Sequence, residues 1–331
     1  MAHVARAALT VVAPAFIDGF FDAVGSFFAN LAGLQLGPLA LGAALFVGYL
    51  SLRARAFFHV LRAAYPAERF RFRRIWGAYI SAYGINNVLP ARAGDVMKLY
   101  LVKESIPNSH YPAVGAAFFV EAIFDAVMAV FILAFAFSQG VFPKPPDFAD
   151  LDAFSLSFLA SNPQLTLFIL TAVAVGALVL FAVLSARVKA FWERVRQGVV
   201  IVHDRRRYLR EVFALQFLGW LLRFAAMWAL LEAFNIGGSV QNTLLVLGTY
   251  AVAAVVPITP SGAGVQQALI LQVFAGTAAT ATVAAYSVGL AITVGATTLI
   301  VGFLALVFIF DIRSFGEAVR RGKADREAAT A

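Results

Sequence analysis

The chain has 331 residues, of which 61% are hydrophobic and 13% are charged, and its mean hydropathy is +0.83. A typical soluble domain carries roughly 25% charged residues, so this composition excludes a soluble enzyme, a soluble DNA-binding module and a secreted scaffold. The net charge of +8 would suggest nucleic acid as the partner of a soluble protein, but the 26 lysines and arginines lie mostly in short segments between apolar runs. That spacing is typical of the cytoplasmic loops of a membrane protein, so we expect a membrane environment and no nucleic-acid partner.

The sequence lacks the residues of several common catalytic and metal sites. It has no cysteine, and its four histidines are widely separated, which makes a zinc site improbable. No phosphate-binding P-loop and no G-x-S-x-G nucleophile motif occurs. We therefore expect neither an enzyme nor a bound cofactor or metal ion.

Residues 1–35 precede the first long apolar run. Polar residues recur there at every fourth position, namely Asp18, Asp22, Ser26 and Asn30. This periodicity predicts an amphipathic helix that lies flat at the membrane surface. A first spanning helix whose polar stripe packs on its neighbours is the alternative that the sequence leaves open.

Five apolar segments are each long enough to cross a bilayer, and they predict a single all-α, polytopic membrane domain over 36–310. These segments are 36–58, 113–138, 164–186, 212–234 and 282–310. Two further apolar stretches, 75–111 and 241–276, are interrupted by proline, glycine and polar residues. A polar tail over 311–331 follows the domain.

The charges of the loops predict the topology. Basic residues concentrate in 53–74, in 187–211 and in the tail after Asp311, whereas 139–163 is acidic. The positive-inside rule places the basic segments and the C-terminus in the cytoplasm and the acidic loop outside. Parity then requires 75–111 and 241–276 to cross an even number of times. We expect five full crossings, an external N-terminus and two re-entrant helical hairpins that open from opposite faces, as in inverted-repeat transporters.

The tips of the two broken stretches resemble each other, because 86–95 and 256–264 both contain P-x-x-x-G. Irregular backbone at bilayer depth is tolerated only where it is buried in protein or lines a cavity. We therefore expect the tips to meet at a substrate cavity. Gln267 and its neighbour Gln266 could hydrogen-bond a headgroup there, or serve only in helix packing. The candidate substrate-binding residues at the tips are Asn87, Pro90, Gly94, Pro260, Gly262, Gly264 and Gln267.

Three charged residues, Arg92, Asp95 and Lys98, follow the first tip. A helix that begins near Gly94 would place Asp95 and Lys98 one turn apart on one face. The free N–H groups of its first turn and the guanidinium fork of Arg92 would then favour a lipid phosphate. An Arg92–Asp95 ion pair that closes the hairpin, or an Arg92 at cytoplasmic headgroup depth, is the structural alternative.

Two acids and one further arginine lie within the predicted spans. A charge at the bilayer centre costs roughly 2.5–3.5 kcal/mol or more, so each needs a partner or a function. Glu121 and Asp125 are four residues apart and share one helix face, and we expect Arg223 or Arg92 to be their partner. A structural ion-pair network is one interpretation. The other is that an acid exchanges a proton or releases a substrate headgroup during transport.

At these residues the sequence resembles the lysylphosphatidylglycerol synthase transmembrane region, the flippase-like domain of the multiple peptide resistance factor, over about 36–310. N-N-V-L-P-A-R-A-G-D-V-M-K at 86–98 is similar to the family's N-x-x-x-P-x-R-x-G-[ED]-x-x-[RK]. V-E-A-I-F-D at 120–125 is similar to E-R-x-x-D, and P-S-G-A-G-V-Q-Q at 260–267 is similar to P-x-G-x-G-x-x-E. Ala122 stands where the family has arginine, and Gln267 stands where it has glutamate.

The resemblance implies a bacterial or archaeal inner-membrane protein that moves a phospholipid or a polyprenyl-phosphate-type lipid between leaflets without a bound cofactor. We expect no lysyl transfer, which in the family belongs to a separate appended domain. Two other functions stay open: an enzyme or accessory subunit acting on a polyprenyl phosphate or glycolipid, and a non-transporting partner that stabilises a membrane glycosyltransferase. The sequence also leaves open whether the chain forms a homo-oligomer.

Overall fold

The computed structural model describes residues 33–87, 92–138, 189–253 and 264–312. Within these ranges the chain forms helices joined by turns and contains no strand. Several predictions fall outside the described residues: the N-terminal amphipathic helix, the span 164–186, almost all of the polar tail, and Pro90, Pro260 and Gly262.

Four apolar helical segments of the described residues are long enough to cross a membrane, and they match four of the five predicted spans. At about 1.5 Å per residue, the 29 residues of the first one rise about 44 Å, which exceeds a hydrocarbon layer of about 30 Å. The segments are α2 (Leu36–Ala64), α5 (Tyr111–Ser138), the continuous run of α9 (Arg205–Tyr208), η3 (Leu209–Phe213) and α10 (Ala214–Ala233), and α13 (Thr280–Phe310).

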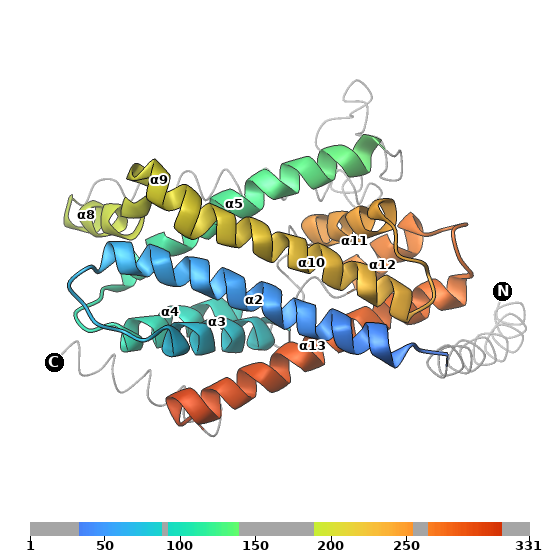
Figure 1. Ribbon diagram of the computed structural model, residues 1–331, viewed down its shortest axis with the longest axis horizontal. Coiled ribbons are helices and arrows are strands. Elements are labelled where there is room, and N and C mark those ends of the chain that lie inside the picture. Colours follow the sequence, from blue (N-terminus) through green and yellow to red (C-terminus); the bar gives the residue numbers. More distant parts are fainter. Residues whose placement is uncertain (1–32, 88–91, 139–188, 254–263, 313–331) are drawn as a thin grey trace, which may run out of the picture.

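Helices α2 and α10 pack side by side and form the centre of the bundle (Figure 1). Their backbones come close at Gly42, where an added Cβ would lie 2.7 Å from a side-chain carbon of Leu230 and 3.2 Å from the carbonyl oxygen of Ala226. Phe46 and Met227 are fully buried beside this contact. Small residues at such contacts are typical of membrane helices, which associate through close packing rather than through the hydrophobic effect.

The first broken stretch folds into two short helices, α3 (Phe72–Asn86) and α4 (Ala93–Ser105), which pack on each other. Their outer ends meet the turn after α2, since the backbone N–H of His110 donates to the Tyr65 hydroxyl (3.2 Å) and the Asn108 amide donates to the Glu68 carboxylate (3.0 Å). The stretch therefore enters and leaves at the same end of the bundle.

The second broken stretch contains α11 (Val240–Ala253) and α12 (Val265–Val273). Phe234 before α11 and Phe274 after α12 both contact the ring of Tyr286, with centroid distances of 5.7 and 6.4 Å. At this end α2 begins, because the N–H of Gln35 donates to the carbonyl of Ala233 (3.0 Å). The two helix pairs thus enter from opposite ends of the bundle (Figure 1), and their re-entry into a bilayer stays a prediction.

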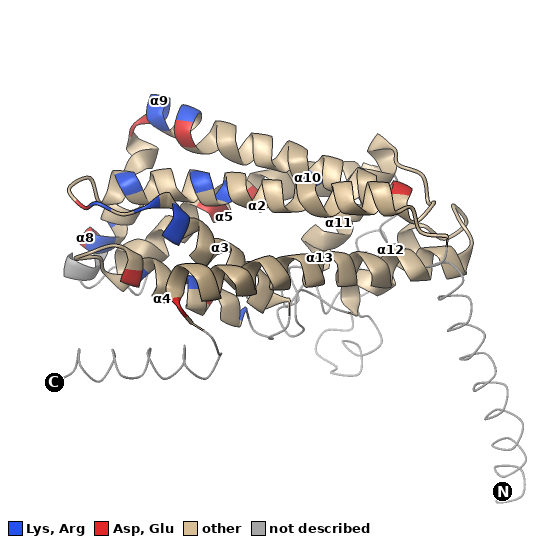
Figure 2. Ribbon diagram, turned by 60° about the horizontal axis from the view of Figure 1, so that its bottom comes forward, with Lys and Arg blue, Asp and Glu red and all other residues tan. Residues whose placement is uncertain are grey.

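Lysine and arginine gather at one end of the bundle, around α8 (Lys189–Gly198), α9 and the C-terminal part of α2 (Figure 2). Helix α13 also ends there, since Arg73 Nη2 donates to the carbonyl of Phe308 (3.1 Å). The described part of the opposite end carries little charge (Figure 2). This polarity agrees with the charge pattern of the predicted loops.

The basic loop predicted to start at residue 53 starts later in the structure. Arg53 was expected at the start of the basic loop 53–74, but α2 continues to Ala64 and the side chain of Arg53 is buried. The helix continues because Phe57, Leu61 and Ala64 extend a buried apolar stripe at helical spacing. An arginine that the sequence assigned to a loop therefore lies inside the helical bundle.

Candidate functional site

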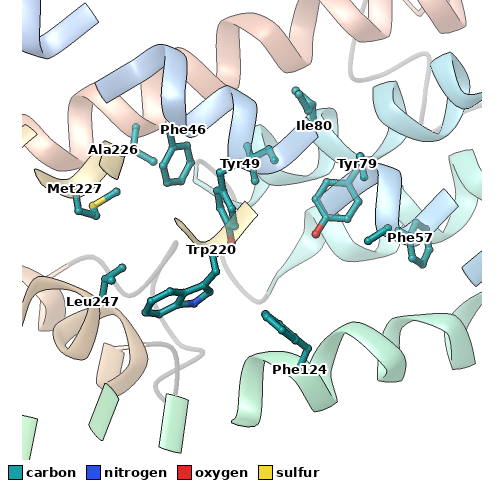
Figure 3. Close-up of a cluster of buried hydrophobic side chains, with 14 of the residues drawn as sticks. Phe46, Tyr49, Phe57, Tyr79, Ile80, Phe124, Trp220, Ala226, Met227 and Leu247 are labelled. Carbon is teal, nitrogen blue, oxygen red and sulfur yellow. The ribbon is translucent and has the colours of Figure 1, made fainter. Parts of the chain in front are cut away.

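A cavity of about 800 Å³ opens between the two broken helix pairs. Asn86, Asn87 and the first residues of α4 line it on one side, Gln266 and Gln267 of α12 line it on another, and residues of α2, α5, α10, α11 and α13 complete its wall. Figure 3 shows Tyr49, Tyr79 and Trp220, three of the lining residues, extending from α2, α3 and α10. Pockets of roughly 300–1,000 Å³ accommodate small molecules, so this one has the size of a lipid headgroup site. Described residues on both sides of the two predicted tips thus line one cavity.

Arg53 and Asp125 form the strongest polar contact of the cavity wall. Nη1 and Nη2 of Arg53 donate to Oδ1 and Oδ2 of Asp125 at 2.5 and 2.7 Å, and Nε donates to the Tyr79 hydroxyl at 2.9 Å. The arginine side chain is only 8% exposed, whereas the carboxylate is 46% exposed towards the cavity. Such bidentate, charge-assisted pairs are among the strongest hydrogen bonds in proteins. They connect α2, α3 and α5 at one wall.

Lys98 and Glu121 form a second, deeper pair. Nζ of Lys98 lies 3.4 Å from Oε2 of Glu121, and both side chains are buried. The ammonium also lies 3.9, 4.6 and 5.1 Å from the ring centroids of Phe118, Tyr79 and Phe57, so cation–π attraction supports it. Oε1 of Glu121 lies 3.9 Å from Nη2 of Arg53 and has no hydrogen-bond partner. The two pairs therefore form one connected charge network.

The predicted partners of the two acids are wrong. The sequence pointed to Arg92 or Arg223, but the structure brings Arg53 and Lys98 to the carboxylates. Arg53 comes from a neighbouring helix, and its distance to α5 depends on how α2 is rotated, which the spacing of residues does not reveal. One signal was available, because Arg53 falls inside the predicted span 36–58 as well as in the predicted loop.

Arg92 and Asp95 form the ion pair that the sequence analysis named as the structural alternative, with Nε 2.9 Å from Oδ2. Arg92 precedes α4 in a left-handed conformation (φ 54°), and 72% of its side chain is exposed at the edge of the cavity. The hairpin itself is closed by Asn86, whose Oδ1 accepts the N–H of Gly94 (2.7 Å) and whose Nδ2 donates to Asp95 Oδ1 (3.1 Å). Helix α4 thus begins one residue before the predicted position.

Arg223 on α10 has no carboxylate partner among the described residues. Its guanidinium carbon lies 5.6 Å from the ring centroid of Tyr49 and 5.2 Å from that of Tyr250. The Nε atom is buried and makes no hydrogen bond. Arg223 therefore contributes an unneutralised positive charge to the cavity that it lines.

Three predicted tip residues have local structural partners. Oε1 of Gln267 accepts the N–H of Gly264 (2.6 Å) and caps the start of α12. Gly264 itself has a φ of 87°, which glycine adopts without strain. Asn87 donates to Thr298 Oγ1 (2.9 Å) and so ties α3 to α13. Gln266, by contrast, is buried beside the cavity, and its Nε2 atom has no hydrogen-bond partner.

Polar lining residues that the sequence analysis did not select include Tyr49, Arg53, Tyr79, Asn86 and Tyr250. The tyrosines occur inside predicted apolar segments, where a hydroxyl needs a polar partner when it is buried. The need of a buried hydroxyl for a polar partner could therefore have marked these tyrosines as candidate lining residues. It does not reveal which neighbouring helix supplies the partner.

The site offers little for metal coordination. The carboxylates of Glu121 and Asp125 are engaged by Lys98 and Arg53. No group of three histidine, aspartate or glutamate side chains in the described ranges could hold a metal ion. The described residues of the cavity wall offer hydrogen bonding and charge pairing.

Comparison with known proteins identifies the family of the chain. No curated protein and no solved structure matches it. The model of one family, described as the lysylphosphatidylglycerol synthase TM region, matches residues 4–305, which is most of the chain. This range includes three of the four apolar helical segments in full, most of the fourth, and both broken helix pairs. The chain is thus a multi-pass membrane protein that belongs to the family of the lysylphosphatidylglycerol synthase transmembrane region.

Proposed function

We propose that this protein is a lipid translocase of the inner membrane, which moves a phosphate-bearing amphipathic lipid from one leaflet to the other. The charged cavity of about 800 Å³, which both broken helix pairs reach, carries this proposal. A lipid headgroup cannot cross hydrocarbon without replacing the hydrogen bonds it makes to water, because unpaired polar groups cost several kcal/mol there. The polar wall of the cavity supplies such replacements.

The opposed arrangement of the two helix pairs supports movement between leaflets. Helices α3–α4 and α11–α12 enter from opposite ends of the bundle, and the cavity lies where they approach each other. A site at such a meeting point is accessible in turn from either side when one pair shifts against the other. The lipid tails would stay in the bilayer while the headgroup passes through the cavity.

Arg92 is proposed as the first phosphate contact. Its side chain is exposed at the edge of the cavity, and the ion pair with Asp95 engages Nε, so that both Nη groups remain for a phosphate. The following N–H groups of α4 add a favourable dipole. The half-exposed carboxylate of Asp125 faces the same cavity. Its negative charge would repel a bound phosphate and so favour release of the lipid.

The orientation follows from the distribution of charge. Basic side chains gather at the end of the bundle where α2 and α13 finish (Figure 2). By the positive-inside rule this end, and with it the C-terminus, faces the cytoplasm. The first helix pair then opens to the cytoplasm and the second to the outside.

Filling the cavity tests the proposal directly. Ala122 and Ala126 of α5 line the cavity, whereas Val130 of the same helix does not line it and is 66% exposed. Purified protein in liposomes should move a fluorescent anionic phospholipid between leaflets, measured by quenching the label in the outer leaflet. The Ala122→Trp/Ala126→Trp variant should transport much more slowly, and Val130→Trp should resemble the parent. A parent no faster than empty liposomes, or a filled variant as fast as the parent, contradicts the proposal.

A further inference from the structure

The charges that line the cavity do not balance. Among the described residues, four basic and three acidic side chains line it. Each acid has its own basic partner, in the pairs Arg92–Asp95, Arg53–Asp125 and Lys98–Glu121. Arg223 remains, so the ionised side chains of the described wall leave one positive charge in excess.

The two tips that join the described helices of the wall add no charge to this balance. The two tips, 88–91 and 254–263, contain no ionisable residue. The predicted span 164–186 contains none either. A buried charge without a counter-charge is costly, so the described wall of the cavity favours the binding of an anion.

The contacts of Arg223 are those expected of a residue that binds an anion reversibly. The ring of Tyr49 contacts two guanidinium groups, with centroid distances of 5.8 Å to Arg53 and 5.6 Å to Arg223. A ring attracts a cation but accepts no full hydrogen bond from the guanidinium fork. Nε of Arg223 accordingly has no hydrogen-bond partner. Asp125 already neutralises Arg53, so Arg223 is the guanidinium at this ring that a further anion would compensate.

A second unpaired donor lies close by. Gln266 is 5% exposed and its Nε2 atom has no hydrogen-bond partner. Its amide approaches the Tyr250 hydroxyl without reaching full hydrogen-bond geometry, and the ring of Tyr250 also contacts Arg223. An unpaired buried donor loses its hydration without replacement, at a cost of about 1–3 kcal/mol. Both donors belong to the same cavity, and one oxyanion could satisfy both.

We infer that Arg223 and Gln266 form a binding site for one monoanionic oxyanion group, the phosphodiester of a lipid whose headgroup carries a net charge of −1. Arg92 is not part of this site. The single excess charge makes the site selective, since a zwitterionic headgroup brings its own cation and leaves Arg223 uncompensated. The inference rests on the proposed translocase function for the source of the anion. It names the class of substrate as anionic phospholipids.

Binding in detergent, without transport, tests this inference. Short-chain phosphatidylglycerol and short-chain phosphatidylcholine are titrated into the purified chain by calorimetry, with inorganic phosphate as a third, soluble probe. The parent should bind one phosphatidylglycerol per chain, and phosphatidylcholine at least about tenfold more weakly. Free phosphate binding as tightly as the lipid would show that the site serves a soluble anion and would overturn the lipid assignment.

Three variants separate the site from a general effect of charge. Arg223→Gln should weaken phosphatidylglycerol binding about tenfold or more and abolish the preference over phosphatidylcholine, and Gln266→Leu should weaken it less. Arg206→Gln removes an exposed charge from α9 and should change nothing. Arg223→Lys keeps the charge and should keep the preference at lower affinity, which also provides a test if Arg223→Gln does not fold.

The outcomes distinguish this inference from the proposed function. Selective binding that depends on Arg223 in a chain that moves no lipid would contradict the translocase and leave the anion site standing. Transport by a chain whose Arg223→Gln variant binds phosphatidylglycerol as tightly as the parent would contradict the anion site alone. Equal binding of both phospholipids by the parent would also overturn it.

Discussion

Arg53 and Asp125, 72 residues apart in sequence, meet through two parallel N–H···O hydrogen bonds that join α2 to α5. Removing charges from water costs several kcal/mol per ion, and only near-ideal geometry offsets that cost. The contact therefore stabilises the wall of the cavity as long as both partners are present.

Breaking this pair should destabilise the protein. Arg53→Gln leaves Asp125 without its cation and Glu121 with Lys98 alone, and we expect a loss of roughly 3 kcal/mol at most, because Asp125 is half-exposed. Thermal unfolding in detergent measures the loss. Arg55→Gln, two residues along the same helix and without a carboxylate partner in the described chain, should cost clearly less. The double variant Arg53→Gln/Asp125→Asn should recover part of the stability, and failure to recover any would contradict the pairing.

Lys98 and Glu121 should be energetically coupled. Lys98→Met leaves the buried carboxylate of Glu121 with only the longer contact to Arg53, and Glu121→Gln leaves a buried ammonium with only its aromatic contacts. The double variant removes both charges, so its loss of stability should fall short of the summed single losses by roughly 0.5–3 kcal/mol. A double-mutant cycle from thermal unfolding gives this coupling energy. Strict additivity would show that the two groups do not interact.

Gly94 should tolerate no side chain. A Cβ at this position would overlap the carbonyl oxygen of Ala82 and lie 2.7 Å from Oδ1 of Asn86, which accepts the N–H of Gly94. Gly94→Ala should therefore cost about 1–3 kcal/mol or more, because the hairpin must open. Gly115→Ala is the matched control, since a Cβ there meets nothing within 4 Å and alanine favours a helix by about 0.8–1.0 kcal/mol. Similar stabilities of the two variants would refute the close contact.

The contribution of Arg92 to transport should depend on the two-point geometry of its guanidinium group rather than on its positive charge alone. Arg92→Lys keeps the charge but loses the Nε contact to Asp95 and the two-point grip on a phosphate. We expect slower leaflet-resolved transport of a fluorescent anionic lipid in proteoliposomes. Arg71→Lys, in the exposed basic turn before α3, should be nearly silent. If Arg92→Ala is folded and transports at the parent rate, Arg92 serves only the ion pair with Asp95.

The opposed arrangement predicts which surfaces face which side of the membrane. The chain contains no cysteine, so single cysteines can be introduced without background. Ala67 and His110 are exposed at the same end of the bundle, where the N–H of His110 donates to the Tyr65 hydroxyl, so Ala67→Cys and His110→Cys should react with an impermeant thiol reagent from the same side. Val240→Cys, which is 57% exposed at the start of α11, should react from the other side. Labelling of positions 67 and 110 from opposite sides would exclude a hairpin at 75–111.

Apolar length and loop charge alone determined the class of this protein. Twenty or more apolar residues in hydrocarbon must satisfy their own backbone hydrogen bonds, which leaves the helix as the structure of each long run. For the same reason the proline and glycine interruptions predicted the breaks between α3 and α4 and between α11 and α12. The start of α4 was predictable to one residue, because it depends on the local chemistry of the turn around Gly94.

Only the tertiary structure decided which charges meet. The spacing of Glu121 and Asp125 shows that they share a face of α5, but the rotation of α2 and the position of α4 bring Arg53 and Lys98 to that face. Arg223 instead faces tyrosines of α2 and α11. Contacts between helices arise from the packing of many side chains at once, and no local pattern encodes them. The excess positive charge of the cavity is for this reason a property of the fold.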